Sequence, residues 1–249
     1  MSLLLAALVL ATGPVPSPAF GLDSTWDKGK PEVITYTTTS SRGAPHESQL
    51  IIRKGLTAKK NVSSLEMTYA SEDGDRHQRA VARFDRATFR PIEIEADWSD
   101  SGHNRSTHVR VQESELAARS KDDVVLHLPA GDSRVLFYDV LPSMLRAYDL
   151  STPSTLSIHM LPTQLSKEIP SASLIPVEVV FYGHAGRPSE TSRGGLQVDV
   201  RYQGRTDQMW FHPGPGHELL VWERADTTML TLRKNERVPQ GGLIKRLYK

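Results

Sequence analysis

The feature that most constrains the fold of this chain is an alternation of apolar and polar residues, which recurs from Val33 onward. Successive side chains of a strand point to opposite faces of a sheet, so this alternation indicates strands with one buried and one solvated face. Turn-forming Gly, Pro, Asn and Asp residues interrupt it roughly every ten to twenty residues. The pattern therefore predicts an antiparallel, all-β fold.

The strands expected from this pattern span residues 33–39, 49–53, 64–69, 80–85, 92–98, 107–112, 124–128, 134–138, 155–160, 177–182, 196–202, 208–211, 219–223 and 229–233. Two of these segments, 92–98 and 196–202, alternate cleanly, with apolar side chains on one face and charged or polar ones on the other. One-sided strands in such a series favour a strongly curved antiparallel sheet or a β-barrel. Segments 23–32 and 183–195 are expected to be loops, and 241–249 a basic, loosely held tail.

One short helix is expected at residues 140–148, where Leu141, Leu145 and Tyr148 recur at helical spacing. Asp139 precedes it as a candidate cap, and Pro142 falls in its first turn, where proline is tolerated. The helix could cover an open end of the sheet, although a simple crossover between strands is the favoured interpretation.

The N-terminus has the character of an export signal, with an apolar run at residues 3–11 that is far shorter than the roughly 20 residues of a membrane-spanning helix. Ala19 and Gly21 fit a signal peptidase site, which predicts a signal peptide at 1–21, cleavage after Gly21 and a single β-rich domain at 22–249. No positive charge precedes the apolar run, which departs from the usual pattern.

The chain has no cysteine, which excludes disulfides and a lipidated cysteine, and its formal net charge is only +1. A long exported animal or plant chain usually carries disulfides, so their absence favours a bacterial periplasm. Balanced charge without a basic tract argues against nucleic acid as the main partner.

The C-terminal part carries three recognisable runs, Val198-Asp199-Val200-Arg201-Tyr202, Met209-Trp210-Phe211-His212-Pro213 and His217-Glu218-Leu219-Leu220-Val221-Trp222-Glu223. They resemble the closing strands of an exported bacterial all-β family of unknown function, in which "W-F-x-P" turns into "L-L-x-W". The segment 137–150, with Arg146 and Asp149 in an Arg-x-x-Asp ending, resembles the same family. That family is similar to the half-barrel of outer-membrane lipoprotein carrier proteins. The resemblance covers about a quarter of the chain and implies a curved sheet around an apolar cavity, with no catalytic residues.

The sequence points to no metal site, cofactor or catalytic centre. The histidine pairs His103 with His108 and His212 with His217 lack the three or four converging ligands that a transition metal needs, so solvated or hydrogen-bonded turn histidines are expected. No nucleophile elbow or glycine-rich phosphate loop is present, and Gly194-Gly195 is expected to form a turn.

Glu93 and Glu95 lie on one face of an expected strand, a spacing that glycosidases can use when a second strand supplies the partner. The next strand carries basic and polar side chains across a hairpin, namely Arg105, His108, Arg110 and Gln112. We therefore favour an exposed cross-strand charge ladder, which would set the strand register.

Large apolar side chains occupy both faces of the C-terminal meander. Trp210 and Phe211 are adjacent and must point to opposite faces, and Leu220 with Trp222 alternates against Leu219 with Val221. Either the second face is covered by the 140–148 helix and the N-terminal segment, or it is an apolar binding surface. The apolar lining of a ligand site is expected to include Trp98, Met209, Phe211, Leu219 and Trp222.

These observations favour a periplasmic, non-enzymatic protein that binds or carries an amphipathic, lipid-like component of the cell envelope. Two other classes stay open: an assembly or scaffolding factor for an outer-membrane complex, recognised through a strand edge, and an envelope polysaccharide or lipid hydrolase. Lipid, a lipoprotein or an envelope protein complex would be the partner.

Overall fold

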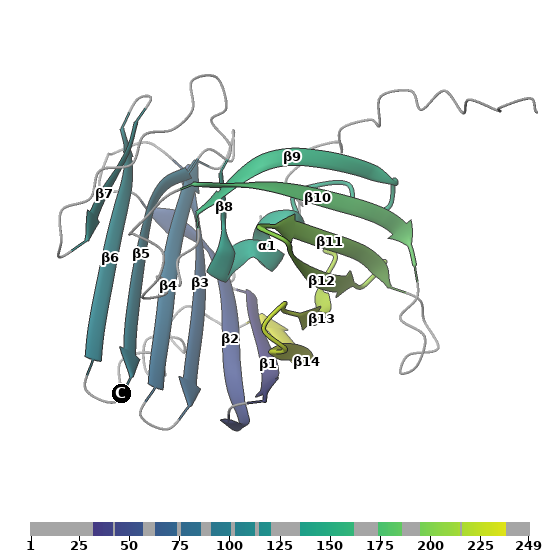
Figure 1. Cartoon of the computed structure of the whole chain (residues 1–249), viewed down its shortest axis with the longest axis horizontal. Coiled ribbons are helices and arrows are strands. Elements are labelled where there is room, and N and C mark those ends of the chain that lie inside the picture. The colour runs from purple at the N-terminus through teal and green to yellow at the C-terminus, as the bar shows by residue number, and fades with distance from the viewer. Residues whose placement is uncertain are drawn as a thin grey trace, which may run out of the picture.

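The computed structural model describes residues 32–41, 43–56, 63–73, 76–85, 91–100, 103–112, 115–120, 135–161, 174–185, 195–214 and 216–237. Almost all of them lie in strands (Figure 1). The N-terminal strands are β1 (Glu32–Ser40), β2 (Gly43–Leu56), β3 (Ser63–Asp73), β4 (Arg76–Asp85), β5 (Pro91–Asp100), β6 (His103–Gln112) and β7 (Glu115–Ser120). The C-terminal strands are β8 (Val135–Phe137), β9 (Ser154–Leu161), β10 (Ile175–His184), β11 (Leu196–Tyr202), β12 (Arg205–Phe211), β13 (Leu219–Glu223) and β14 (Met229–Arg237).

The all-β prediction is confirmed, and the described strands form one barrel-shaped sheet of 14 strands. Expected strand 124–128 and the signal peptide lie outside the described residues, while β7 was not predicted. Most observed strands extend beyond the predicted ones, because polar residues near the hairpins break the alternation while the backbone ladder continues.

The strand order is β7-β6-β5-β4-β3-β2-β1-β14-β13-β12-β11-β10-β9-β8. Two antiparallel meanders, β1–β7 and β9–β14, are joined where β1 pairs with β14, so strands from the two ends of the described chain meet in the middle of the sheet. In Figure 1 the strands of the first meander are long and lie side by side, and the second meander curves around the helix. The interior of this curve is the centre of the hydrophobic core.

The predicted helix is present but short, as a 3-10 turn η2 (Tyr138–Val140) followed by α1 (Leu141–Leu145). This helical segment connects β8 to the parallel strand β9, so it is a crossover, as favoured. All five residues of α1 are buried, so the helix also fills the space enclosed by the curved sheet. Pro142 lies in the first turn as expected. The expected cap is wrong: the N-cap position of α1 is Val140, and Asp139 lies inside η2, where its buried side chain accepts a hydrogen bond from Gln78 of β4.

The core is one continuous cluster that includes large side chains from both meanders and from the β8–α1 connection. Its largest fully buried members include Trp222, Tyr36, Tyr69, Phe84, Phe137, Phe181 and Phe211. Phe84 of β4 and Phe137 of β8 bring their ring centroids to 5.5 Å, so strands far apart in the sheet order meet across the interior. Each such side chain contributes about 1.5–3 kcal/mol of hydrophobic stabilisation.

The alternation predicted for the C-terminal meander is wrong at one position. A register shift pairs Phe211 with Leu219 and Trp210 with Val221, which leaves Leu220 as the extra residue of a bulge. The bulge turns Leu219 and Trp222 to the same interior face, where both are buried.

The second face of this meander is covered rather than open at Trp210, which is 7 % exposed and lies outside the core cluster. The helix is not its cover, because α1 packs on the opposite, interior side. Gly195 lies against Trp210: a Cβ at this glycine would be 3.4 Å from the Cβ of Trp210 and 3.2 Å from the carbonyl oxygen of Phe211. Within the described ranges, no helix has the length and apolar character to cross a membrane.

Candidate functional site

The strongest concentration of buried polar groups lies inside the sheet, at the end where the β11–β12 and β13–β14 turns are located. The β11–β12 hairpin turns at Gln203 and Gly204, which both have positive φ (47° and 72°), as a tight hairpin turn requires. This turn places Tyr202 and Asp207 on the interior face near the end of the sheet. Trp222 and Arg224 project from β13 and the residue after it.

Asp207 is the centre of this inner cluster and has no solvent exposure (0 %). One carboxylate oxygen accepts hydrogen bonds from the Tyr138 hydroxyl (2.9 Å) and Trp222 Nε1 (3.0 Å). The other accepts from the Tyr202 hydroxyl (2.9 Å) and the backbone N–H of Ala225 (2.9 Å). Four neutral donors therefore satisfy the buried carboxylate, as a buried charge requires.

Arg224 lies beside Asp207 but is held differently. Its guanidinium carbon is 4.1 Å from the ring centroid of Trp222, 5.4 Å from that of Tyr138 and 5.8 Å from that of Tyr69. These are cation–π distances. The residue is 7 % exposed, and in the described part of the chain its Nε and Nη2 are buried without a hydrogen-bond partner. The site therefore contains a buried cation with unused donors.

The protonation states of the inner cluster follow from burial. Burial raises the pKa of Tyr138 and of Tyr202, so both phenols stay protonated and donate to Asp207. Burial by itself lowers the pKa of Arg224, but the surrounding tyrosines and the carboxylates of Asp139 and Asp207 outweigh it and raise that pKa. The guanidinium is therefore charged.

A second carboxylate borders the same cluster. Asp139 of η2 is 1 % exposed and accepts a hydrogen bond of 2.8 Å from Gln78 Nε2 of β4. Asp139 and Asp207 both act electrostatically on Arg224. The inner cluster thus combines the guanidinium of Arg224 with two carboxylates and three aromatic side chains. Of its members, only Trp222 was predicted from the sequence to be part of a site.

At the other end of the sheet, a buried ion pair ties the helix to β1. Arg146 Nη1 lies 3.2 Å from Glu32 Oε2, its Nη2 donates to Glu32 Oε1 (3.2 Å), and its Nε donates to the Gly216 carbonyl. Asp149 accepts from the Ser151 hydroxyl at 2.6 Å, which with the Thr152 hydroxyl lowers the pKa of Asp149. The Arg-x-x-Asp ending therefore has a structural role.

The turn histidines are hydrogen-bonded to backbone, as expected. His212 Nδ1 accepts from the Gly214 N–H (2.9 Å), and His217 Nδ1 lies 3.3 Å from the His212 carbonyl. His103 and His108 lie in β6, and their side chains are outside the described part of the structure. Among the described residues, no three His, Asp or Glu side chains are grouped to hold a metal ion.

The charge ladder predicted at Glu93 and Glu95 has the expected register, with Glu93 opposite Arg110 and Glu95 opposite His108. Among the described side chains, the cation comes from the strand on the other side: Arg83 of β4 pairs with Glu93, with Glu95 at 3.6 Å and with Glu66 at 2.9 Å. The ladder was expected to be exposed, but of these side chains only Glu95 is, because Arg83 and Glu93 are half-buried and Glu66 is buried. Burial lowers the pKa of Arg83, but hydrogen bonds to Glu93 and Glu66 outweigh it and raise that pKa.

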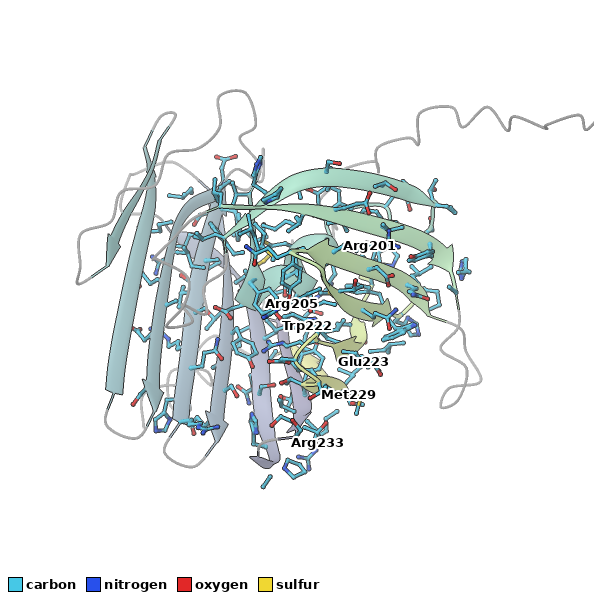
Figure 2. All side chains as sticks on the ribbon, viewed as in Figure 1. Arg201, Arg205, Trp222, Glu223, Met229 and Arg233 are labelled. Atoms are coloured by element: carbon cyan, nitrogen blue, oxygen red, sulfur yellow. The ribbon has the colours of Figure 1, made fainter. Side chains whose placement is uncertain are left out.

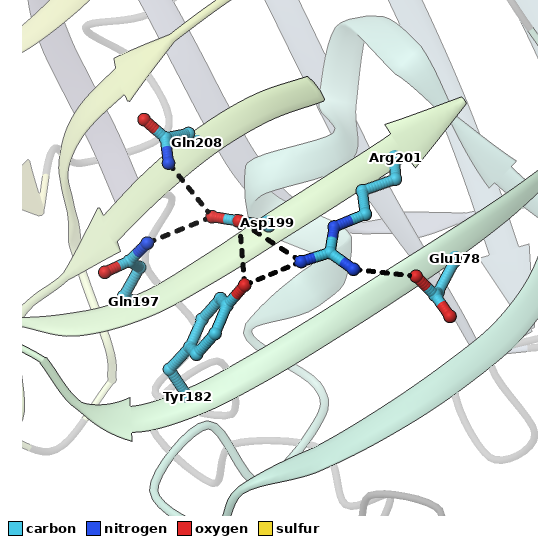
Figure 3. A network of polar contacts seen from close by, with 6 residues as sticks. All are labelled: Glu178, Tyr182, Gln197, Asp199, Arg201 and Gln208. Atoms are coloured by element: carbon cyan, nitrogen blue, oxygen red, sulfur yellow. Dashed lines mark hydrogen bonds and ion pairs between the residues drawn. The ribbon is translucent and has the colours of Figure 1, made fainter. Parts of the chain in front are cut away.

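An outer polar cluster lies on the solvent-facing side of β10–β12 (Figure 3). Asp199 accepts from the Tyr182 hydroxyl (3.0 Å) and Gln197 Nε2 (3.1 Å), and it lies 3.9 Å from Arg201 Nη2. Gln208 Nε2 also donates to Asp199 at 3.4 Å. Arg201 in turn donates to the Tyr182 hydroxyl (2.8 Å) and to Glu178 (3.0 Å).

Four of the five residues expected to line a ligand site converge in the interior. Met209, Phe211 and Trp222 have 0 % exposure and Leu219 has 1 %. Figure 2 labels Trp222 among the side chains inside the curved meander. Trp98 lies in β5 opposite Gln78 and Arg105, two residues from the core-packed Ala96, but its side chain is outside the described part. Their role as a ligand lining stays a prediction.

Sequence reasoning missed Tyr138, Tyr202, Asp207 and Arg224. Asp207 follows the β11–β12 turn and Arg224 precedes the β13–β14 turn, so both look like ordinary polar hairpin ends. The strand alternation could have identified Asp207. It lies two and four residues before Met209 and Phe211, so its side chain is on the same, otherwise apolar face of β12.

No protein-family model and no curated protein matches the sequence. The fold is similar to a solved structure, the β-barrel-like protein of domain of unknown function DUF1849 from Brucella abortus, with a TM-score of 0.50 and 9 % sequence identity. The similarity covers 84 % of this chain and 98 % of that one. At this identity it supports a shared barrel-like fold, and it does not extend to the lipoprotein carriers.

Proposed function

We propose that this protein is an exported, periplasmic binding protein that holds or carries an amphipathic, lipid-like component of the bacterial cell envelope without covalent chemistry. Export is proposed from the apolar run at residues 3–11 and the cleavage site after Gly21. An amphipathic ligand is proposed because the sheet interior combines a continuous apolar core with a buried polar cluster beside it.

The observation that carries this proposal is Arg224. Its Nε and Nη2 have no acceptor among the described residues, although the guanidinium is charged and buried. An unsatisfied buried donor costs about 1–3 kcal/mol, so a bound acceptor at this position would offset a real cost. Met209, Trp222 and Leu230 provide apolar surface on the same interior side.

To bind in the interior, the ligand would have to replace packing contacts between the second meander and the η2–α1 connection. The interior side chains of the second meander pack against the η2–α1 connection, which is joined to the strands by hydrogen bonds such as Tyr138 to Asp207. We expect the apolar part of the ligand to lie along Trp222 and Met209 and its polar part to lie at Arg224.

The test is to purify the exported protein without detergent, extract it with organic solvent and analyse the extract by mass spectrometry. We expect a lipid-like molecule in stoichiometric amount, and we expect the delipidated protein to bind an environment-sensitive dye that the extract displaces. The matched control is the same protein unfolded and washed in urea before extraction. An empty extract together with no dye binding by the folded protein would refute the proposal.

A further inference from the structure

We infer that the polar part of the ligand is an uncharged hydrogen-bond acceptor, such as an ester or amide carbonyl or a sugar hydroxyl, bound by Nε and Nη2 of Arg224. This inference rests on the proposed function and names the chemistry of the ligand at that same site. Its basis is the pair of unused donors together with the charges that surround them.

The two donors favour a specific geometry. Nε and Nη2 lie on one edge of a planar guanidinium, so they present two parallel N–H groups to a single acceptor or to two neighbouring ones. Both atoms are buried without a partner among the described residues. A carbonyl oxygen accepts two hydrogen bonds, and adjacent sugar hydroxyls accept one each, so either group would satisfy this edge.

The charges around Arg224 disfavour an anion. The groups that act on it electrostatically are Tyr138, Tyr69, Asp139 and Asp207. Since burial keeps Tyr138 neutral, the described acidic groups that act on the guanidinium are the two buried carboxylates of Asp139 and Asp207. A phosphate or carboxylate on the ligand would bring a further negative charge beside these two carboxylates, which is costly in a low-dielectric interior.

The guanidinium is also held in position before anything binds. Trp222 and Tyr138 stack on it, and both donate to Asp207 through Nε1 and the hydroxyl, which fixes their rings. Asp207 is therefore a positioning residue that acts on Arg224 through these two aromatic side chains. A preorganised fork loses little conformational entropy when an acceptor arrives.

The test compares two amphiphiles with the same alkyl chain, uncharged dodecyl maltoside and anionic dodecyl phosphate, below their micellar concentrations. Binding to the delipidated full-length mature protein is measured by calorimetry and by displacement of the dye. We expect dodecyl maltoside to bind more tightly than dodecyl phosphate, and Asp139→Asn to increase affinity for dodecyl phosphate because it removes one negative charge.

Arg224→Met removes the donors but keeps an apolar chain against Trp222, and we expect it to weaken dodecyl maltoside binding about 10-fold to 100-fold. Arg205→Met is the matched control, because Arg205 is exposed on β12, and it should bind like the wild type. If Arg224→Met fails to fold by circular dichroism, Arg224→Lys replaces it; lysine retains the charge and loses the fork, so weaker binding is again expected.

Two results would overturn the inference and leave the proposed function intact: tighter binding of dodecyl phosphate than of dodecyl maltoside, or binding of dodecyl maltoside by the folded Arg224 variant with wild-type affinity. Binding of neither amphiphile nor dye, together with an empty extract, would refute the proposed function, and the inference with it.

Discussion

The C-terminal meander carries an aspartate–arginine cluster on each of its faces, and the arginines of the two clusters are held in opposite ways. On the outer face, Asp199 and Arg201 interact with each other and share the Tyr182 hydroxyl (Figure 3). On the inner face, Asp207 takes neutral donors and Arg224 takes aromatic rings.

This difference follows from solvent. The difference lies at the arginines: the Arg201 side chain is 45 % exposed, so water completes whatever its neighbours leave unsatisfied, whereas Arg224 is 7 % exposed. The two aspartates are both buried, at 6 % for Asp199 and 0 % for Asp207, and both accept hydrogen bonds from neutral side chains. The outer cluster can therefore use water at its rim, and the inner cluster is a site in which each charge needs a specific partner.

The largest expected difference between the clusters is in stability. Asp207→Ala should lower the free energy of unfolding by about 3–5 kcal/mol, because it leaves four donors without their acceptor, Trp222 Nε1 among them fully buried, and removes a carboxylate that compensates the buried charge of Arg224. Asp199→Ala should cost about 0.5–1.5 kcal/mol, because Tyr182 and its neighbours can turn to water. Urea denaturation measures both. Equal losses would show that the two faces do not differ as described.

A smaller effect separates the tyrosines of the two clusters at alkaline pH. Burial raises the pKa of Tyr138 and Tyr202 above the ordinary 10.0, and partial burial with the Asp199 hydrogen bond raises that of Tyr182. A raised pKa stabilises the fold fully below pH 10 and progressively less above it, because the unfolded chain then loses protons that the fold retains.

Tyrosinate absorbance, followed together with unfolding, tests this prediction. Tyr182 should ionise while the protein is still folded, and Tyr138 and Tyr202 only when it unfolds. Tyr182→Phe should remove one tyrosinate from the early step, whereas Tyr202→Phe should leave that step unchanged. If Tyr202→Phe removed a tyrosinate from the early step and Tyr182→Phe did not, the assignment of Tyr182 as the more accessible phenol would be contradicted.

The smallest effect is expected on the outer face. Arg201→Gln removes contacts to Glu178 and Tyr182, and because this pair is exposed we expect a loss of only about 0–1 kcal/mol. The loss should disappear in high salt, which screens surface pairs. A loss that persists in high salt would indicate that this face is shielded from solvent.

Much of the fold could be predicted from local pattern. Alternation placed nearly all the described strands, and the helix was found because Leu141 and Leu145 recur at helical spacing. The role of Asp139 could not be predicted, because capping is a local property, whereas the hydrogen bond to Gln78 joins residues 61 positions apart. Leu220 shows the same limit: alternation cannot reveal a bulge that depends on the pairing of β12 with β13.

By itself the sequence determined that this protein is an antiparallel β structure with one short helix, and it identified Met209, Phe211, Leu219 and Trp222 as apolar anchors. Only the tertiary structure decided that β14 returns to β1 and that Tyr138, Asp207 and Arg224 meet in the interior. Strand periodicity is encoded between near neighbours, whereas the environment of a charge depends on which distant residues surround it, and that is established only when the sheet curves around its core.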